Sequence, residues 1–262
     1  MKYIFNNVYA EHWYNIATML DENYPTENSS IFLGNYIFEN VDSYRSELGE
    51  NVKLIVYQTE PLVDNHWHPS DKIINNLKSA DEIWEYDINN YHYLRRLGFT
   101  NVYFKPFLFT KALENIPEKE PEIDILFYGT ITPYRYEVLK TIDLFNKCRK
   151  FVYLFFVTGK ELDDYISKSK IVLDLNTWSN GYQKQSRISY LLNNKKCVLS
   201  EKSLNNFYGN AIFEFNNDLH SFDILFEYLL QDDNWKKQGQ LGYEMFKRMT
   251  IQSFKDIYHG QV

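Results

Sequence analysis

Short runs of β-branched and aromatic residues alternate along this chain with stretches long enough to form amphipathic helices. This alternation limits the fold more than any other feature, because βαβ units of this length build a parallel sheet wrapped by helices. The sequence therefore predicts an α/β protein. Ligands of such sheets bind at the carboxyl ends of the strands, so functional residues are expected there.

Apolar runs predict strands at residues 31–33, 53–57, 82–86, 101–104, 123–128, 151–157, 171–175, 197–200 and 211–215. Amphipathic stretches predict helices at residues 70–79, 88–97, 134–148, 160–168, 184–193, 219–230 and 233–249. Gly98 follows the second of these helices in the position that commonly ends a helix. The last two helices are expected to close the chain.

The pattern breaks between residues 108 and 122, where charged residues accompany Pro117 and Pro121. Proline and charge in one short stretch are typical of a linker. We therefore predict two domains, residues 1–112 and residues 113–262, with the last helix packing back on the first domain.

Charge is distributed unevenly along the 262 residues, whose formal net charge is −7. Residues 1–120 contain 10 Lys and Arg against 18 Asp and Glu, a net −8, whereas the remainder contains 18 against 17, a net +1. An acidic half is a poor surface for nucleic acid, and a near-neutral half with clustered bases can hold a phosphorylated ligand.

The cellular compartment is predicted from three absences in the sequence. Cys148 and Cys197 lack the spacing of metal ligands, which favours buried free thiols in a reducing compartment. No apolar run reaches the roughly 18 residues that span a bilayer. Residues 1–7 lack the apolar core of a signal peptide. We expect a cytoplasmic protein, or one in the host cytoplasm if it is viral.

The first candidate site follows the strand at 123–128, in the segment from Tyr128 to Arg135. Gly129 permits a tight turn and close approach to a ligand, and the N–H groups after Thr130 favour an anion at the helix start. Arg135 can add a charged contact to a phosphate. Alternatively, the segment is a plain strand-to-helix turn with a solvent-facing arginine.

The second candidate follows the strand at 171–175, where Asn176 and Thr177 begin a polar loop that leads to a helix carrying Arg187. These side chains can bind hydroxyls and a diphosphate, although a plain loop with a surface arginine is the alternative. A third candidate is Glu201, which follows the strand at 197–200 and can accept hydrogen bonds from sugar or ribose hydroxyls.

The fourth candidate follows the strand at 53–57, where Glu60 is placed to act as a general base in a cleft between the domains. His66 and His68 lie close by in the sequence and are rivals for this role. A metal would need a third, remote ligand beside these two histidines, so we expect no metal site.

Six phrases in order along residues 53–250 carry a resemblance to a known family. They are Ile55–Glu60, Ala80–Asp87, Asp124–Thr130 with Arg135, Ser169–Leu175, Arg187–Lys195 and Val198–Glu201. In this order and spacing the chain resembles a family of small bacterial and viral glycosyltransferases of the GT-B architecture.

The resemblance implies two Rossmann-like domains that face a central cleft. It implies that the C-terminal domain binds a nucleotide-sugar, the N-terminal domain binds the acceptor, and no metal or other cofactor is required. Similar proteins usually have a glutamate three residues before the helix arginine, where this chain has Lys184. The carboxylate for donor hydroxyls is therefore assigned to Glu201.

Three functions are consistent with these observations. The first is a glycosyltransferase that moves a sugar from a nucleotide-sugar to a hydroxyl of a saccharide or small acceptor. The second is a phage-type enzyme that glycosylates a hydroxymethylated base in DNA. The third is a non-catalytic protein that retains a nucleotide-sugar pocket, which the Lys184 departure favours.

Overall fold

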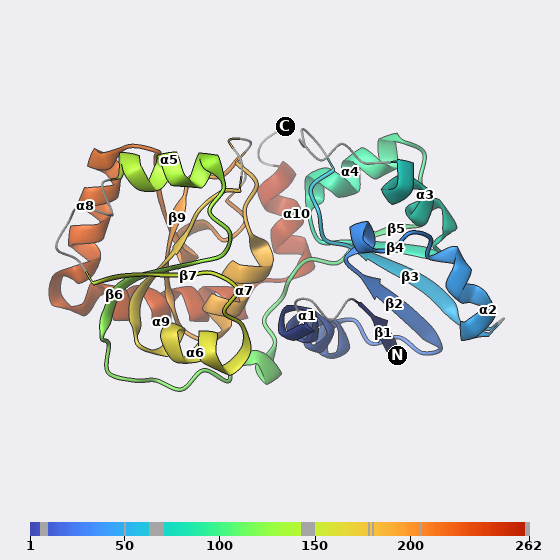
Figure 1. The fold of residues 1–262 in the computed structure, drawn as a ribbon, viewed down its shortest axis with the longest axis horizontal. Coiled ribbons are helices and arrows are strands. Elements are labelled where there is room, and N and C mark those ends of the chain that lie inside the picture. The colour runs from blue at the N-terminus through green and yellow to red at the C-terminus, as the bar shows by residue number, and fades with distance from the viewer. Residues whose placement is uncertain are drawn as a thin grey trace. The chain divides into compact units, whose positions relative to one another are not determined.

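The computed structural model describes residues 1–5, 10–49, 51–62, 71–142, 150–177, 179, 181–204 and 206–259, without the side chains of 257–259. The chain divides into two compact units. Unit 1 contains residues 1–108 and 250–262, and unit 2 contains residues 109–249. The two sheets, one in each unit, are entirely parallel in their described pairings (Figure 1).

Unit 1 is built on a five-stranded sheet in the order β1-β2-β3-β4-β5. Its strands are β1 (Lys2–Ile4), β2 (Ser29–Leu33), β3 (Lys53–Gln58), β4 (Glu82–Glu85) and β5 (Val102–Phe104). Its α-helices are α1 (Ala10–Asn23), α2 (Arg45–Leu48), α3 (Asp71–Ser79), α4 (Ile88–Arg96) and α10 (Ile251–His259), and short 3₁₀ turns span Asn35–Ile37 and Asp42–Tyr44. Because the strands follow chain order, this sheet grows in one direction only.

One face of the unit 1 sheet forms a closed apolar core. Phe32, Val56 and Ile83, from three neighbouring strands, pack with Leu77 of α3 and Leu94 of α4. Side chains alternate between the faces of a strand, so these residues mark the face that α3 and α4 cover. On β3, Leu54 and Val56 belong to this core, whereas the buried Ile55 and Tyr57 occupy the alternate positions.

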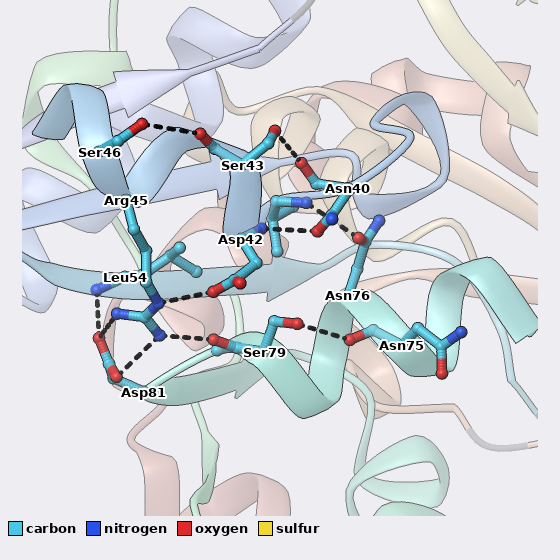
Figure 2. Close-up of polar contacts among 12 residues, drawn as sticks. Asn40, Asp42, Ser43, Arg45, Ser46, Leu54, Asn75, Asn76, Ser79 and Asp81 are labelled. Carbon is cyan, nitrogen blue, oxygen red and sulfur yellow. Dashed lines mark hydrogen bonds and ion pairs between the residues drawn. The ribbon is translucent and has the colours of Figure 1, made fainter.

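A polar cluster holds the amino ends of β3 and β4 (Figure 2). Arg45 donates to both carboxylate oxygens of Asp81 at 3.1 and 3.0 Å and to the carbonyl of Ser79 at 2.6 Å. Asp81 also accepts from the backbone N–H of Leu54 at 2.7 Å. This cluster lies at the edge opposite the carboxyl ends, so it supports the sheet rather than a ligand site.

Unit 2 has a five-stranded sheet in the order β10-β9-β8-β6-β7. Its strands are β6 (Ile123–Tyr128), β7 (Phe151–Leu154), β8 (Ser169–Asp174), β9 (Cys197–Glu201) and β10 (Phe213–Phe215). Its α-helices are α5 (Pro133–Thr141), α6 (Gly159–Ser167), α7 (Gln185–Asn193), α8 (Leu219–Leu230) and α9 (Asn234–Lys247), with 3₁₀ turns at Lys111–Leu113, Gly209–Ala211 and Gln231–Asp233.

The unit 2 sheet is covered on both faces. Phe127, Leu173 and Phe215 pack with Leu139 of α5 and Phe226 of α8. Helices α6 and α9 contact β8, and α7 and α9 contact β9. Figure 1 shows α5 and α8 on one side of this sheet and α6, α7 and α9 on the other. Buried on both faces, these strands form near-continuous apolar runs, as parallel sheets require.

Several sequence predictions differ from the structure in detail. The strand predicted at 151–157 ends at Leu154, because Phe156 has a positive φ of 58° that breaks an extended backbone. The helix predicted at 134–148 is α5, which ends at Thr141, and residues 143–149 lie outside the described residues. A third helix, α10, follows the two that were expected to close the chain and contacts α4 of unit 1.

Candidate functional site

The order of strands in unit 2 reverses between β6 and β8. The chain passes from β6 to the edge strand β7, then crosses back to β8 on the other side of β6. In open α/β sheets, ligands bind outside the carboxyl ends of the strands at such a switch point. The described order of unit 1 has no equivalent reversal, so the candidate site lies on unit 2.

Gly129 lies directly after β6 at this switch point and has a φ of 121°. A β-carbon built on this residue would lie 2.9 Å from Nη2 of Arg187 and 3.7 Å from Nη1 of Arg135. Its backbone N–H donates to the carbonyl of Leu154 at 3.0 Å. Glycine is therefore required for the backbone conformation and for the approach of two guanidinium groups.

The turn after Gly129 begins α5 in the way that its residue types dictate. Thr132 is the N-cap, and its hydroxyl accepts from the N–H of Arg135 at 3.2 Å. Pro133 occupies the first turn, where its missing N–H has no consequence. These features match the plain-turn alternative, except that Arg135 is buried, with 3% of its surface exposed, instead of facing solvent.

The buried guanidinium of Arg135 ties the turn after β6 to the end of β8. It donates to the carbonyls of Thr130 at 2.8 Å, Leu175 at 2.7 Å and Asn176 at 3.0 Å, and to the Thr177 hydroxyl at 3.4 Å. Such bonds satisfy most of its donors. This environment differs from the phosphate-facing one expected from the sequence, and it gives Arg135 a clear role in holding the two strand ends together.

Arg187 extends from the first turn of α7 to the same place. It pairs with Asp174, the last residue of β8, at 2.9 Å, and its guanidinium lies over the ring of Tyr128 at 4.5 Å. The Arg187 side chain keeps 13% of its surface exposed, whereas that of Asp174 keeps 1%. Of the two arginines at the switch point, Arg187 is therefore the one that retains more contact with solvent than Arg135.

The charges around the switch point influence one another. Burial, followed by the neighbouring Arg187, lowers the pKa of Arg135 to about 10, which leaves it charged near neutral pH. Burial raises the pKa of Asp174, although the two arginines oppose this effect. One carboxylate oxygen of Asp174 has no hydrogen-bond partner among the described residues. Asp174 thus lies beside two arginines, and the Glu201 carboxyl also acts on Arg135.

Glu201, the last residue of β9, is buried beside this cluster. Its Oε2 accepts from the N–H of Asn176 at 2.9 Å, and its Oε1 accepts from the hydroxyl of Tyr134. Burial raises the pKa of the Glu201 carboxyl, against the effect of these two bonds. The amide of Asn176 donates to the carbonyl of Lys202 at 3.0 Å. Both side chains thus hold the strand ends in register.

Glu60 lies two residues after β3 in unit 1, in a segment fixed through its backbone. The Glu60 carbonyl accepts from Gln58 at 2.9 Å and from Asn90 of α4 at 2.8 Å. The same Asn90 amide accepts from the N–H of Leu62 at 2.7 Å, so it holds both sides of Pro61. His66 and His68, the rival candidates, lie outside the described residues.

Two buried acids lie at the carboxyl end of β4 beside this segment: Glu85, its last residue, and Asp87. Glu85 is fully buried, and its Oε1 accepts from the N–H of Asp87 at 2.9 Å. Its Oε2 has no hydrogen-bond partner among the described residues. Burial raises the pKa of Glu85 well above its ordinary value, which favours the neutral acid. Asp87 caps α4 by accepting from the N–H groups of Asn89 and Asn90.

Three other sequence predictions concern metal ligands, the cysteines and membrane-spanning helices. Within the described part of the chain, no three His, Cys, Asp or Glu residues gather as metal ligands. Cys197 is a buried free cysteine, and Cys148 lies outside the described residues. None of the helices that the structure describes has both the length and the apolar character to cross a membrane.

The structure brings the predicted unit 2 residues into one connected cluster. Hydrogen bonds and contacts join Gly129, Thr130, Arg135, Asn176, Thr177, Arg187 and Glu201. The sequence interpretation gave no role to Asp174, Tyr128 or Tyr134. The available signal was the carboxylate of Asp174 inside an apolar strand, which requires a partner when buried.

The two parallel sheets define the class of fold, which is GT-B, with two Rossmann-like domains. Among solved structures, the chain is similar to a mutant of S. aureus TarM in complex with fondaparinux, α-GlcNAc-glycerol and UDP. The TM-score is 0.54 at 13% identity, over 97% of this chain and 58% of that one. The chain thus spans little more than half the length of TarM.

Two further structures support the same fold. Anabaena Alr3699/HepE in complex with UDP and glucose gives a TM-score of 0.54 at 8% identity, over 89% of this chain and 77% of that one. An α1,3-fucosyltransferase with GDP-fucose gives 0.51 at 12% identity, over 98% and 87%. No protein-family model and no curated protein matches the sequence. The predicted GT-B resemblance is confirmed at the level of the fold.

Proposed function

We propose that this protein is a glycosyltransferase that moves a sugar from a nucleotide-sugar donor to a hydroxyl of a saccharide or small acceptor. The observation that carries the proposal is Arg187, held over Tyr128 beside Gly129 at the switch point of unit 2. The GT-B fold supports it, because the similar structures named above contain UDP or GDP-fucose.

In this proposal, Arg187 binds the diphosphate of the donor. A planar guanidinium suits paired phosphate oxygens, and a charge-assisted hydrogen bond contributes about 1.5–3 kcal/mol. Arg135 adds positive charge and holds the loop after Gly129 in place through its bonds to carbonyls. As the bond between the anomeric carbon of the sugar and the diphosphate breaks and the glycosidic bond to the acceptor forms, these cations stabilise the departing diphosphate without a metal ion.

Glu201 is proposed to accept hydrogen bonds from donor hydroxyls. Each of its carboxylate oxygens already accepts one bond, from Tyr134 and from Asn176, and each can accept a second. The same two bonds orient the carboxylate, so a hydroxyl would meet a rigid acceptor rather than a mobile one.

Glu60 is proposed as the base that removes the proton of the acceptor hydroxyl in an inverting reaction. It follows β3 at the carboxyl edge of the unit 1 sheet, and its backbone is anchored by Gln58 and Asn90. His66 and His68 are the alternatives for this role. A retaining enzyme can dispense with such a base, so the anomeric configuration of the product belongs to any test of Glu60.

A turnover assay tests the proposal. The protein is incubated with a panel of nucleotide-sugars, with and without EDTA, and release of nucleoside diphosphate is followed. Slow hydrolysis of one donor that persists in EDTA is expected. Binding of a donor without turnover would favour the non-catalytic alternative, and absence of both would contradict the proposal.

The acceptor class is argued from charge. Residues 1–120 carry a net −8, which repels the phosphate backbone of DNA and favours an uncharged saccharide or small acceptor. Duplex DNA with hydroxymethylated bases is therefore expected not to bind, even in low salt. Tight binding that is lost steeply as the salt concentration rises would redirect the proposal to a DNA acceptor.

A further inference from the structure

A cavity lies along the outer edge of the unit 1 sheet, beside its last strand β1 (Figure 1). Its volume is about 310 Å³, and its lining includes the consecutive residues 2–5, Tyr14 of α1, and Tyr44 and Glu47. Successive side chains of a strand point to opposite faces, so a cavity lined by consecutive residues follows the edge of the strand. No described strand pairs with that edge, which leaves backbone N–H and C=O groups available there.

Aromatic rings form two walls of this cavity. On one side, Phe5 and Tyr14 meet edge to face with ring centroids 5.2 Å apart, and Tyr14 has 56% of its surface exposed. On the other side, Tyr44 packs against the unit 1 core, where it meets Phe32 edge to face with centroids 5.2 Å apart. The cavity therefore offers flat apolar surfaces that are already in place before a ligand binds.

Several polar groups at the cavity are unused within the described part of the chain. The hydroxyls of Tyr14 and Tyr44 form no hydrogen bond to a described residue. Lys2 and Glu47 form no ion pair with one either. Hydroxyls that both donate and accept favour a ligand that does the same. One positive and one negative charge balance each other, so the cavity has no preference for an anion or a cation.

Carbohydrates combine these properties, because a sugar ring has apolar faces and a rim of hydroxyl groups. We infer that the cavity beside β1 binds part of a neutral oligosaccharide. β1 and β3 are two strands apart, roughly 10 Å, so an oligosaccharide anchored here can extend toward Glu60, which follows β3. The site thus adds an anchor for a longer acceptor. Binding at this site does not rest on the proposed function, because it requires no nucleotide.

The experiment screens the full chain, without nucleotide, on a printed array of neutral and acidic oligosaccharides. The affinity for the neutral oligosaccharide that binds best is then measured by isothermal titration calorimetry. Tyr14→Ala removes the exposed ring, and Tyr44→Phe removes one unused hydroxyl while its ring stays against the core. Tyr103→Ala, which removes an exposed tyrosine ring from β5 at the opposite edge of the same sheet, is the matched control.

Tyr14→Ala is expected to weaken neutral oligosaccharide binding by about tenfold or more, because the ligand loses the apolar area of a whole ring. Tyr44→Phe should weaken it by about twofold to tenfold, the range for one hydrogen bond, and Tyr103→Ala should stay within about twofold of the wild type. A wild type that binds no neutral oligosaccharide, or an affinity unchanged in Tyr14→Ala, would overturn the inference and leave the proposed donor site untouched.

A short-peptide library provides the competing result. An unpaired strand edge can also bind an extended peptide as an additional strand, with side chains in the flanking pockets. Tyr14-dependent binding of a peptide in place of a glycan would therefore overturn the inference and assign the edge of β1 to strand addition. Peptides are expected not to bind.

Discussion

The guanidinium of Arg187 occupies the space that a side chain at position 129 would need. A substitution at position 129 therefore tests the role of Arg187, because the β-carbon of an alanine there would lie 2.9 Å from Nη2 of Arg187 and displace it. Gly129→Ala is expected to weaken nucleoside diphosphate binding by about tenfold, in the range of one charge-assisted hydrogen bond. Calorimetric titration measures the effect.

The control for this substitution separates contact from backbone strain. Gly98 has a φ of 93° with nothing within 4 Å of a built β-carbon, so Gly98→Ala carries the cost of the positive φ without a clash. That cost is about 1–2 kcal/mol of stability. Equal nucleotide affinity in the two variants would show that Gly129 does not act through Arg187.

At Glu60 the prediction concerns catalysis rather than binding. Glu60→Gln removes the proton acceptor while keeping the size of the side chain, so turnover should fall by about a hundredfold or more with donor affinity unchanged. Rates measured together with the anomeric configuration of the product, by NMR, check this. Near-normal turnover by an inverting enzyme would transfer the role to another group.

At the scale of elements, α4 fixes the segment that follows β3. Asn90 donates to the carbonyl of Glu60 and accepts from the N–H of Leu62. Asn90→Ala therefore removes the acceptor of the buried Leu62 N–H and leaves the Glu60 carbonyl with its bond from Gln58 alone. We expect a loss of about 1–3 kcal/mol in the free energy of unfolding and reduced turnover with unchanged donor binding. Asn75→Ala, on the exposed surface of α3, is the control for losing an asparagine. Turnover equal to wild type in Asn90→Ala would contradict this positioning role.

The buried carboxyl of Glu85, at the end of β4, is expected to make the stability of the protein depend on pH. Burial raises the folded-state pKa of Glu85 above its unfolded value, so the folded protein binds the extra proton. The stability from this group is complete below the unfolded pKa, about 4.3, and is lost as the pH rises through the folded pKa. Urea unfolding between about pH 5 and 9 should show wild-type stability falling relative to Glu85→Gln, by at most about 1.4 kcal/mol per pH unit. Parallel profiles would refute the raised pKa.

At the scale of the whole molecule, the strands were the most predictable feature. The run at 123–128 is β6 residue for residue, because a strand largely buried on both faces is apolar at most positions, and here only Asp124 interrupts the run. β1 escaped prediction since it is a three-residue edge strand that is partly exposed. Phe156 ended β7 early for a backbone reason that an apolar run does not reveal.

The sequence predicted where the site lies in the fold better than it predicted the contacts among the site residues. Glycine and arginine after β6 marked the right strand end, but only the fold brings Arg135 to the carbonyls of β8 and pairs Asp174 with Arg187. Such contacts depend on strand order, and the reversal between β6 and β8 is not encoded in any local pattern. The roles of Glu60 and Glu201 stay predictions.

Donor binding at the switch point of unit 2 is the central claim, and a thermal-shift panel of nucleotide-sugars tests it most directly. A ligand at about a hundred times its Kd stabilises the folded state by about 2.7 kcal/mol, which raises the Tm of a protein of this size by several degrees. At least one nucleotide-sugar should produce that shift in the wild type and a much smaller one in Arg187→Ala, each measured against its own unliganded Tm. No shift with any donor, or equal shifts in the two proteins, would contradict the account.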